Sequence, residues 1–242
     1  MSIRFILVAT SHPGNIGAVA RAMKNMDLGE LVLVRPAAFP HAEATALASG
    51  ADDLLSRTRV VDTLAEAVTD CGLVYGTSAR PRSRYYWPEL TPRAAAPQLL
   101  AAAAAGGRAA VVFGPERTGL SNEELEQCHA LIQIPASARY DSLNLAQAVQ
   151  VVAYEIHCAR GLPAPPERDS PPAPAAELER LYEHFDAVLR EIDFTDRGGG
   201  PHLLRRLRRI FGRAVLDQQE VNILRGILTA VQARRRRAGA AS

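Results

Sequence analysis

The sequence lacks the features that define several large classes of protein. It has only three cysteines, Cys71, Cys128 and Cys158, which are widely separated and form no Cys-x-x-Cys pair. It therefore predicts neither a disulfide framework nor a zinc site, and the thiols are interpreted as buried or incidental. No apolar run reaches the ~18 residues that a membrane-spanning helix needs, and no signal-peptide segment precedes the first apolar stretch. We expect a cytoplasmic protein with no membrane association and no bound metal.

Two common nucleotide-binding signatures are also missing. Gly14 and Gly17 do not complete a Gly-x-Gly-x-x-Gly fingerprint, and the apolar stretch 31–34 is followed by Arg35 and not by an acidic residue. Both observations argue against a Rossmann dinucleotide site. A Walker phosphate loop is absent as well.

Short apolar runs alternate with helical patterns through the first two thirds of the chain. Nearly continuous apolar strands are typical of a parallel sheet covered on both faces, and strict alternation predicts an α/β domain. Ligands of such sheets bind at the carboxyl ends of the strands. Strands are predicted at 3–9, 31–34, 72–76, 108–113 and 131–134, with helices at 43–55, 62–69, 93–105, 121–127 and 144–160.

The composition changes after residue 160. Residues 161–176 are rich in proline, which predicts a semi-rigid extended spacer and a domain boundary. Beyond it, residues 177–192 and 202–213 have helical patterns, and Asp217 with Glu220 predicts the capped start of a last helix. The chain is thus divided into an α/β domain at 1–160, a linker at 161–176 and a small basic helical extension at 177–242.

The charge is distributed unevenly between these parts. Residues 201–242 contain ten arginines and two acidic residues, a net charge of +8, whereas residues 1–200 contain 18 basic and 24 acidic residues, a net charge of −6. A segregated positive charge suits a polyanionic partner. A dimerisation or solubilising appendage is the alternative, because a basic helical surface is often only solvated.

Three stretches carry polar groups suited to a ligand site. Asn15 and Arg21 follow the first strand, and Gly114 and Glu116 follow the strand at 108–113. Ser142 and Asn144 stand where a helix N-cap is expected, so both have a structural explanation as caps. Likewise, Arg21 has an ordinary explanation in a surface salt bridge, and Glu116 in a purely structural pairing.

A fourth stretch adds small polar groups and then basic and aromatic residues. Residues 77–79 follow the strand at 72–76, where ligands of a parallel sheet bind. Arginines alternating through 80–84 precede aromatics at 85–87. This combination suits phosphates and exposed bases, although such aromatics also pack at dimer interfaces.

The stretches 11–28, 111–125 and 134–149, in this order, resemble the three signature motifs of the SpoU family of 2′-O-ribose RNA methyltransferases, in the SPOUT superfamily. The resemblance implies a trefoil knot, S-adenosyl-L-methionine as the cofactor and a homodimer whose active site is completed by Arg21 or the 80–87 loop of the partner chain. With the helical extension, the whole chain is similar to the branch that acts on cytidine and uridine in tRNA, which implies position 32 of the anticodon loop.

The resemblance also assigns residues to roles. Arg21 is expected to hold the substrate phosphate and the 2′-oxygen, Glu116 to orient Arg21, and Asn15 and Asn144 to hold the ribose and the loop. The residues of the catalytic region are Asn15, Arg21, Glu116, Ser142 and Asn144. The cofactor-binding residues are Thr77, Ser78, Ala79, Gly114, Ile134, Asp141, Ser142, Leu143 and Asn144. The RNA-binding residues are Arg80, Arg82, Arg84, Arg205, Arg208 and Arg209.

Three alternatives stay open at this point. A non-catalytic RNA-binding factor with the same fold is expected to lack Arg21, Glu116 or Asn144, and all three are present. A small-molecule α/β enzyme does not need the basic extension. The motifs themselves do not distinguish position 32 from another tRNA position or from ribosomal RNA.

Overall fold

The computed structural model describes residues 3–79, 87–137, 139, 142–161, 170–194 and 200–239. Its strands form one seven-stranded sheet in the order β3-β2-β1-β6-β4-β7-β5, and every pairing is parallel. All carboxyl ends therefore lie at the same edge, as the α/β prediction requires. The strands are β1 (Ile3–Val8), β2 (Glu30–Val34), β3 (Arg59–Val61), β4 (Leu73–Thr77), β5 (Glu89–Leu90), β6 (Ala109–Phe113) and β7 (Ala130–Ile132).

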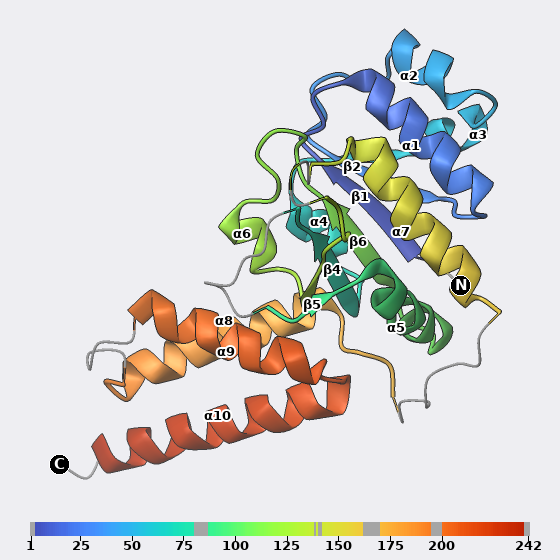
Figure 1. Cartoon of the computed structure of the whole chain (residues 1–242). Helices are drawn as coiled ribbons and strands as arrows, with labels where there is room; N and C mark the ends of the chain where they lie inside the picture. Colours follow the sequence, from blue (N-terminus) through green and yellow to red (C-terminus); the bar gives the residue numbers. More distant parts are fainter. Residues whose placement is uncertain are drawn as a thin grey trace.

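Helices cover both faces of this sheet (Figure 1). One face carries α1 (Pro13–Asn25), α5 (Pro92–Ala104) and α7 (Leu145–Ala159), with α2 (Ala42–Ala48) and α3 (Asp52–Ser56) packed beside α1. The other face carries α4 (Leu64–Val68) and α6 (Asn122–Leu125). Because both faces are covered, the central strands β1 and β6 are buried along their whole length.

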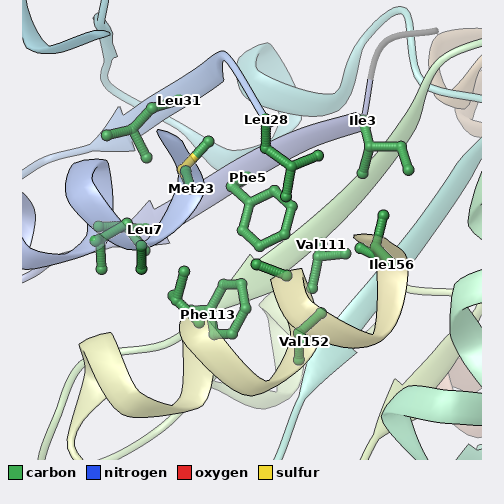
Figure 2. Packing of buried hydrophobic residues seen from close by; sticks show 14 of the residues in the cluster. Ile3, Phe5, Leu7, Met23, Leu28, Leu31, Val111, Phe113, Val152 and Ile156 are labelled. Carbon is green, nitrogen blue, oxygen red and sulfur yellow. The ribbon is translucent and has the colours of Figure 1, made fainter. Parts of the chain in front are cut away.

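Alternate residues of each central strand enter different cores. Phe5 of β1 and Phe113 of β6 point to the α7 side, where their rings stack with centroids 5.7 Å apart. Figure 2 shows Val152 and Ile156 of α7 packed over this pair. The helical spacing of these two residues thus fixes which face of α7 meets the sheet.

The close packing of α1 on α2 depends on a glycine. A Cβ atom at Gly17 would lie 2.0 Å from the carbonyl oxygen of Ala44, which is backbone and cannot move aside. Gly17 is therefore needed for helix contact and not for a nucleotide fingerprint.

The C-terminal helices form a separate small core. They are α8 (Ala175–Glu191), α9 (Gly200–Ala214) and α10 (Gln218–Gly239). Leu181 and Val221 are completely buried between them, and the rings of Phe185 and Phe211 stack at 5.3 Å. The backbone N–H of Asp217 donates to Glu220, and the N–H of Glu220 donates to Asp217, so the predicted cap of the last helix is confirmed.

The end of the predicted linker is docked on both parts of the chain. The N–H of Ala175 donates to the carbonyl of Cys71 at 2.9 Å, and the N–H of Ala173 donates to that of Leu216 at 2.7 Å. A Cβ atom at Gly72 would lie 2.6 Å from the Pro172 carbonyl oxygen. Residues 170–174 thus fasten the C-terminal helices to the sheet domain, and α8 already begins at Ala175, inside the predicted spacer. Residues 162–169 lie outside the described part.

Several predicted elements have different bounds. The helix predicted at 43–55 is divided into α2 and α3, because Ser49 adopts a left-handed conformation with φ of 45° and Gly50 one of 89°. Strands β3 and β5 were not predicted, since three and two residues are too short to give a periodic signal. The strand expected at 131–134 ends at Ile132.

Within the described residues, no helix has the length and hydropathy to cross a membrane, and no three His, Cys, Asp or Glu side chains are grouped to hold a metal ion. Two of the thiols, Cys71 and Cys128, are buried, whereas Cys158 is exposed. Burial raises the pKa of Cys71 to about 12, so this thiol stays protonated at neutral pH.

Candidate active site

The three sequence motifs converge at the carboxyl edge of the sheet. The loop after β1 leads into α1, the loop after β6 carries Glu116, and the segment after β7 ends at the start of α7. Hydrogen bonds join these segments across 101 to 129 residues of sequence. The described residues therefore place the motifs in one cluster, as the parallel sheet predicts.

Glu116 is the centre of this cluster. Its carboxylate accepts hydrogen bonds from the backbone N–H of Ser11 at 3.0 Å, from the Ser11 hydroxyl at 2.9 Å and from the Asn15 amide at 2.9 Å. A longer contact of 3.4 Å comes from the N–H of His12. The carboxylate is thus occupied by the loop after β1 and the first turn of α1.

The amides of Asn15 and Asn144 continue the chain of hydrogen bonds. The Asn144 Nδ2 donates to Asn15 Oδ1 at 3.0 Å, while Asn144 Oδ1 accepts from the N–H of Ala146 at 2.9 Å. Gln147 completes a capping box by accepting from the N–H of Asn144. Asn144 is therefore both the N-cap of α7 and a member of this hydrogen-bonded cluster, whereas Ser142 does not cap this helix.

The environment of Glu116 favours its ionised form. Partial burial by itself raises the pKa of this carboxyl, but the hydrogen bonds from Asn15 and Ser11 together outweigh burial and hold the pKa below its usual value. At neutral pH the group is a carboxylate, so it acts only as an acceptor. This charge state fixes the Asn15 amide with Nδ2 toward Glu116 and Oδ1 toward Asn144.

Arg21 lies two turns along α1 and is exposed. Within the described residues it has no hydrogen bond and no ion pair. The expected surface salt bridge is therefore not formed there, and Glu116 contacts Ser11, His12 and Asn15 in place of Arg21. The expected contact in which Glu116 orients Arg21 is not seen. The Glu116 carboxylate accepts hydrogen bonds from Ser11, before α1, and from Asn15, in its first turn.

The end of β4 supplies small polar groups to the same edge. The Thr77 hydroxyl donates to the carbonyl of Val112 at 3.1 Å, and the N–H of Ser78 donates to the carbonyl of Ile132 at 3.1 Å. Ser78 is only half-buried and Ala79 is exposed. Hydrogen bonds to β6 and β7 thus hold this strand end in place, and its side chains are short.

Gly114 is required by the turn that follows β6. A Cβ atom there would lie 2.3 Å from the backbone nitrogen of Leu120. No other residue allows the loop 114–120 to fold back on itself so tightly, because the clash is with backbone. This glycine shapes the loop that carries Glu116.

The loop before α7 presents main-chain groups and one apolar side chain. Ile134 is half-buried against the sheet core, whereas Ser142 and Leu143 are exposed, with Leu143 at 37%. Asp141 lies outside the described residues. An exposed leucine beside polar turns suits the flat face of an aromatic ligand.

The predicted RNA-binding arginines fall into two groups. Arg80, Arg82 and Arg84 lie outside the described residues. In the C-terminal helices, Arg208 forms an ion pair with Glu179 at 2.5 Å and lies 4.4 Å from the centre of the Tyr182 ring. Arg205 pairs with Glu126 of the sheet domain at 2.6 Å, and Arg209 is half-buried. Arg205 and Arg208 thus serve the fold through intramolecular contacts.

A cavity of about 520 Å³ lies away from the motif cluster. It is enclosed by α4 and α6 of the sheet domain and by α8 and α9 of the C-terminal helices. Its wall includes Glu126, Glu179 and Arg208, which form the ion pairs that hold these helices. The cavity belongs to the contact between the two parts of the chain.

Sequence reasoning missed two members of the cluster. Ser11 contacts Glu116 through both its N–H and its hydroxyl, and Gln147 completes the cap at Asn144. Both had a local signal, since Ser11 lies in the polar segment Ser11–His12 just before α1, and Gln147 stands three residues after a cap.

Two family matches cover most of the chain. Residues 2–154 match the SpoU rRNA Methylase family, and residues 176–241 match the family described as tRNA methyltransferase TrmJ, C-terminal domain. The first match alone covers more than half of the chain and contains the whole motif cluster. The seven-stranded parallel sheet with a C-terminal helical part agrees with these two matches.

Similar full-length proteins are known from several bacteria. The chain is 49% identical to the tRNA (cytidine/uridine/adenosine-2′-O-)-methyltransferase TrmJ of Pseudomonas aeruginosa strain UCBPP-PA14, over 95% of this chain and 93% of the relative. It is 46% identical to the tRNA (cytidine/uridine-2′-O-)-methyltransferase TrmJ of Pectobacterium atrosepticum, over 96% and 97%.

A solved structure shares the arrangement of the whole chain. TrmJ from Z. mobilis ZM4 superimposes with a TM-score of 0.82 at 36% identity, over 96% of this chain and all of that one. In the order of strands, β6 lies between β1 and β4, and β7 lies between β4 and β5, so two late strands are inserted into the earlier sheet. The match to this structure implies a trefoil knot.

Proposed function

Because this chain belongs to the SpoU methylase family, we propose that it is a tRNA 2′-O-methyltransferase that methylates the ribose of cytidine or uridine at position 32 of the anticodon loop. The curated relatives that match nearly the full length of the chain are tRNA 2′-O-methyltransferases acting on cytidine and uridine, and one of them also on adenosine. The methyl donor is S-adenosyl-L-methionine, in keeping with the family.

The single observation that carries this proposal is the hydrogen-bonded chain Glu116–Asn15–Asn144, with an exposed arginine on the helix that carries Asn15. It joins three segments from three different strand ends at the edge where parallel sheets bind ligands. The free guanidinium of Arg21 has no described internal partner and is available to an external anion.

The residues at this edge fit S-adenosyl-L-methionine. Ser78 and Ala79 have short side chains at the end of β4, Gly114 allows the tight turn after β6, and exposed Leu143 offers an apolar contact for the adenine. We propose that the cofactor-binding residues are Thr77, Ser78, Ala79, Gly114, Ile134, Asp141, Ser142, Leu143 and Asn144. When bound, this cofactor supplies a methyl group that is already activated for transfer to a nucleophile.

The chain itself has to position a weak nucleophile and favour the loss of its proton. A guanidinium group is a poor base, so we propose that Arg21 binds the phosphate and the 2′-oxygen of the substrate and stabilises the developing negative charge. Correct positioning contributes several kcal/mol of a barrier of this kind. The side-chain amides of Asn15 and Asn144, which the hydrogen bonds within the Glu116–Asn15–Asn144 chain hold in place, bind the ribose. A phosphate oxygen or water accepts the proton of the 2′-hydroxyl.

Further parts of the proposal concern the organisation of the chain. The sheet domain 1–160 holds the catalytic and cofactor sites, 161–176 connects it to the helical extension 177–242, and the protein acts as a homodimer. The two family matches, at 2–154 and 176–241, support this division. Arginines of the 80–84 loop and of the extension bind the tRNA backbone, where cationic side chains supply most of the affinity for a polyanion.

Mass spectrometry of tRNA tests the proposal. The purified protein is incubated with S-adenosyl-L-methionine and unmodified tRNA transcripts that carry cytidine, uridine, adenosine or guanosine at position 32. We expect one 2′-O-methyl group at that position in the cytidine and uridine transcripts. Methylation only at another position, or of ribosomal RNA alone, would contradict the proposed substrate, and a cofactor-binding protein without any transfer would contradict the proposed activity.

A further inference from the structure

The stretch 121–129 connects the Glu116 loop (114–120) with strand β7, and we name it the return segment. Strand β6 ends at the carboxyl edge of the sheet, but β7 begins at the opposite edge, because β6, β4 and β7 are all parallel. The return segment therefore crosses one face of the sheet from the carboxyl edge to the amino edge. It contains α6 and begins directly after the Glu116 loop. A shift of its first turn would thus move the end of that loop.

The start of the return segment is fixed beside the candidate site. The N–H of Ser121 donates to the Glu124 carboxylate at 2.8 Å, and the N–H of Glu124 donates to the Ser121 hydroxyl at 3.2 Å. Just before this capping box, Leu120 is only 3% exposed, and a Cβ atom at Gly76 would lie 3.1 Å from its side chain. Gly76 directly precedes residues 77–79 at the end of β4. The first turn of α6 is therefore coupled to both the Glu116 loop and this strand end.

The end of the return segment is held by the C-terminal helices. The Arg205 guanidinium of α9 pairs with the carboxylate of Glu126 at 2.6 Å, and the two side chains are 44% and 23% exposed. Further along, a Cβ atom at Gly212 would lie 3.9 Å from the Cα of His129, so the backbone of α9 passes close to the start of β7. Figure 1 shows α6 above α8 and α9. One short segment thus joins the docked extension to the loop that carries Glu116.

The packing around this ion pair is open. The cavity of about 520 Å³ lies between α4, α6, α8 and α9, and Glu126 is part of its wall. Closely packed side chains resist displacement, whereas surfaces that a cavity separates lose the contacts that would fix them. The orientation of α6 relative to α9 therefore depends more strongly on the pair of Arg205 with Glu126 than it would in a closely packed contact.

We propose that Arg205 and Glu126 are positioning residues, through which the docked C-terminal helices hold the Glu116 loop in place for methyl transfer. The catalytic part of this inference rests on the proposed function. Arg205 holds the end of the return segment at Glu126, and the capping box holds its beginning. The Glu116 loop then has both ends fixed, one by β6 and one by α6. In this role neither Arg205 nor Glu126 touches the substrate.

The ion pair favours this role for Arg205 over a contact with tRNA. A phosphate that bound Arg205 would have to displace the Glu126 carboxylate, which already lies 2.6 Å away. The next residue, Arg206, is exposed and has no partner among the described residues, so it offers a cation without that loss. The two neighbouring arginines of α9 thus have different tasks.

Hydrogen exchange of the full-length protein tests the positioning role without tRNA. The amide of Gly119 donates to the carbonyl of Pro115 at 2.9 Å and reports the order of the Glu116 loop. Glu126→Gln and Arg205→Gln each remove the ion pair, and Glu126→Arg combined with Arg205→Glu rebuilds it with the charges reversed. Glu183→Gln is the matched control, because Glu183 also lines the cavity but has no partner among the described residues.

We expect either single variant to raise the exchange rate of the Gly119 amide by about two- to fivefold, the size of effect that a partly exposed ion pair supplies. The reversed pair should restore slow exchange, and Glu183→Gln should leave it unchanged. The amide of Ala37, which donates to the carbonyl of Thr10 in another loop, should keep its rate in every variant. An unchanged Gly119 rate in both single variants would overturn the proposal. Equal acceleration at Gly119 and Ala37 would also overturn it, since the pair would then contribute only to overall stability.

Single-turnover transfer at saturating tRNA and cofactor measures the catalytic consequence, because tRNA affinity does not enter this rate. Each single variant should lower it by about two- to fivefold, and the reversed pair should restore it. A rate that falls with Arg205→Gln but not with Glu126→Gln would make Arg205 an RNA contact and overturn the proposal. If the unaltered protein transfers no methyl group, the proposed function fails, whereas the exchange of the Gly119 amide still decides whether the ion pair holds the loop.

Discussion

The two parts of this chain use their arginines in opposite ways. In the sheet domain, Arg21 is exposed on α1, the helix that carries Asn15, and has no partner among the described residues. In the C-terminal helices, Arg208 is paired with Glu179 and lies against the ring of Tyr182, and Arg205 is paired with Glu126. The sheet domain thus presents a guanidinium with no described partner. In the C-terminal helices, Arg205 and Arg208 are paired with acidic groups of the same chain.

This difference shows that net charge is a poor guide to which cations meet a substrate. The charge of +8 on residues 201–242 is a sum over side chains with different tasks. Arg205, Arg208 and Arg235 are engaged with acidic groups of the same chain, whereas Arg206 and Arg213 are exposed and have no partner among the described residues. Only side chains of the second kind are available to RNA without breaking a contact.

The largest expected effect is that of Arg21→Ala. Because Arg21 is proposed to stabilise charge in the transition state, its loss should lower the methyl-transfer rate by on the order of 10² to 10³. The affinity for S-adenosyl-L-methionine should stay within a factor of about two, since the proposed cofactor residues are elsewhere. Single-turnover transfer to tRNA and calorimetry of the cofactor measure these two quantities.

Lys24→Ala is the matched control for this prediction. Lys24 also lies on α1 but forms a surface ion pair with Asp53 at 2.6 Å. Exposed pairs of this kind contribute little to stability, so this variant should keep a near-normal transfer rate. Equal losses of transfer rate in both variants would show that a disturbance of α1, and not the loss of the guanidinium, lowers the rate. Near-normal transfer by Arg21→Ala would contradict the proposed mechanism.

Asn144→Ala should have the next largest effect. It removes both the cap of α7 and the hydrogen bond to Asn15, whereas Gln147→Ala removes only the reciprocal bond of the capping box. Each loss of a cap costs ~1 kcal/mol of stability. We expect a loss of transfer activity of at least about tenfold only for Asn144→Ala, since a misplaced polar group can lower a rate by that much.

Thermal unfolding together with transfer kinetics separates the two contributions. If both variants lose the same activity for the same loss of stability, then Asn144 acts only as a cap. The role of the Glu116–Asn15–Asn144 chain in holding the ribose would then be wrong.

Arg208→Ala should have a smaller effect, on stability and not on catalysis. It removes one partner of a half-buried ion pair and a cation contact with Tyr182, which we expect to lower the free energy of unfolding by ~1–2 kcal/mol. Arg206→Ala, at an exposed position on the same helix, should change it by less than about 0.5 kcal/mol. Denaturant unfolding measures both.

For tRNA affinity the order of the two variants should be reversed, with the larger effect from Arg206→Ala and the smaller from Arg208→Ala. Arg206→Ala should weaken binding and reduce its salt dependence by about one unit of slope, as expected for the loss of one phosphate contact. If Arg208→Ala reduces the slope as much while leaving stability unchanged, the division between structural and RNA-facing arginines does not hold.

The smallest expected effect concerns the pH dependence of stability. Hydrogen bonds from Asn15 and Ser11 outweigh burial, so the folded-state pKa of Glu116 is below its unfolded value of 4.5. The carboxylate therefore stabilises the fold above that value, and this contribution is lost as the pH falls through the folded-state pKa. The free energy of unfolding of Glu116→Gln should fall less steeply with decreasing pH below about 4.5. Parallel profiles for the two proteins would contradict this assignment.

The sequence predicted the parts of the fold that depend on local signals. Continuous apolar runs predicted β1, β2, β4 and β6, and the pair Asp217 and Glu220 predicted the cap of α10, since consecutive residues decide the first feature and residues three apart the second. The two-residue strand β5 has no such signal and exists because Glu89 and Leu90 pair with β7.

The site was predicted in composition but not in all of its contacts. Asn15, Glu116 and Asn144 are brought together as the motifs indicated. The expected bond from Glu116 to Arg21 is replaced by bonds to Ser11 and Asn15, because which groups reach a carboxylate depends on the exact path of the loop after β1. The pairing of Arg208 with Glu179 also requires the packing of α9 on α8, which residue spacing does not reveal.

A tRNA that lacks a single hydroxyl tests the central claim most directly. Two transcripts are prepared that differ only in a 2′-deoxyribose at position 32, and methyl transfer from labelled S-adenosyl-L-methionine is measured for each. The proposed function predicts about one methyl group per molecule of the ordinary transcript and none for the deoxy transcript, because the only acceptor oxygen is missing. Equal incorporation into both transcripts would show that the methyl group goes to another position and would contradict the account.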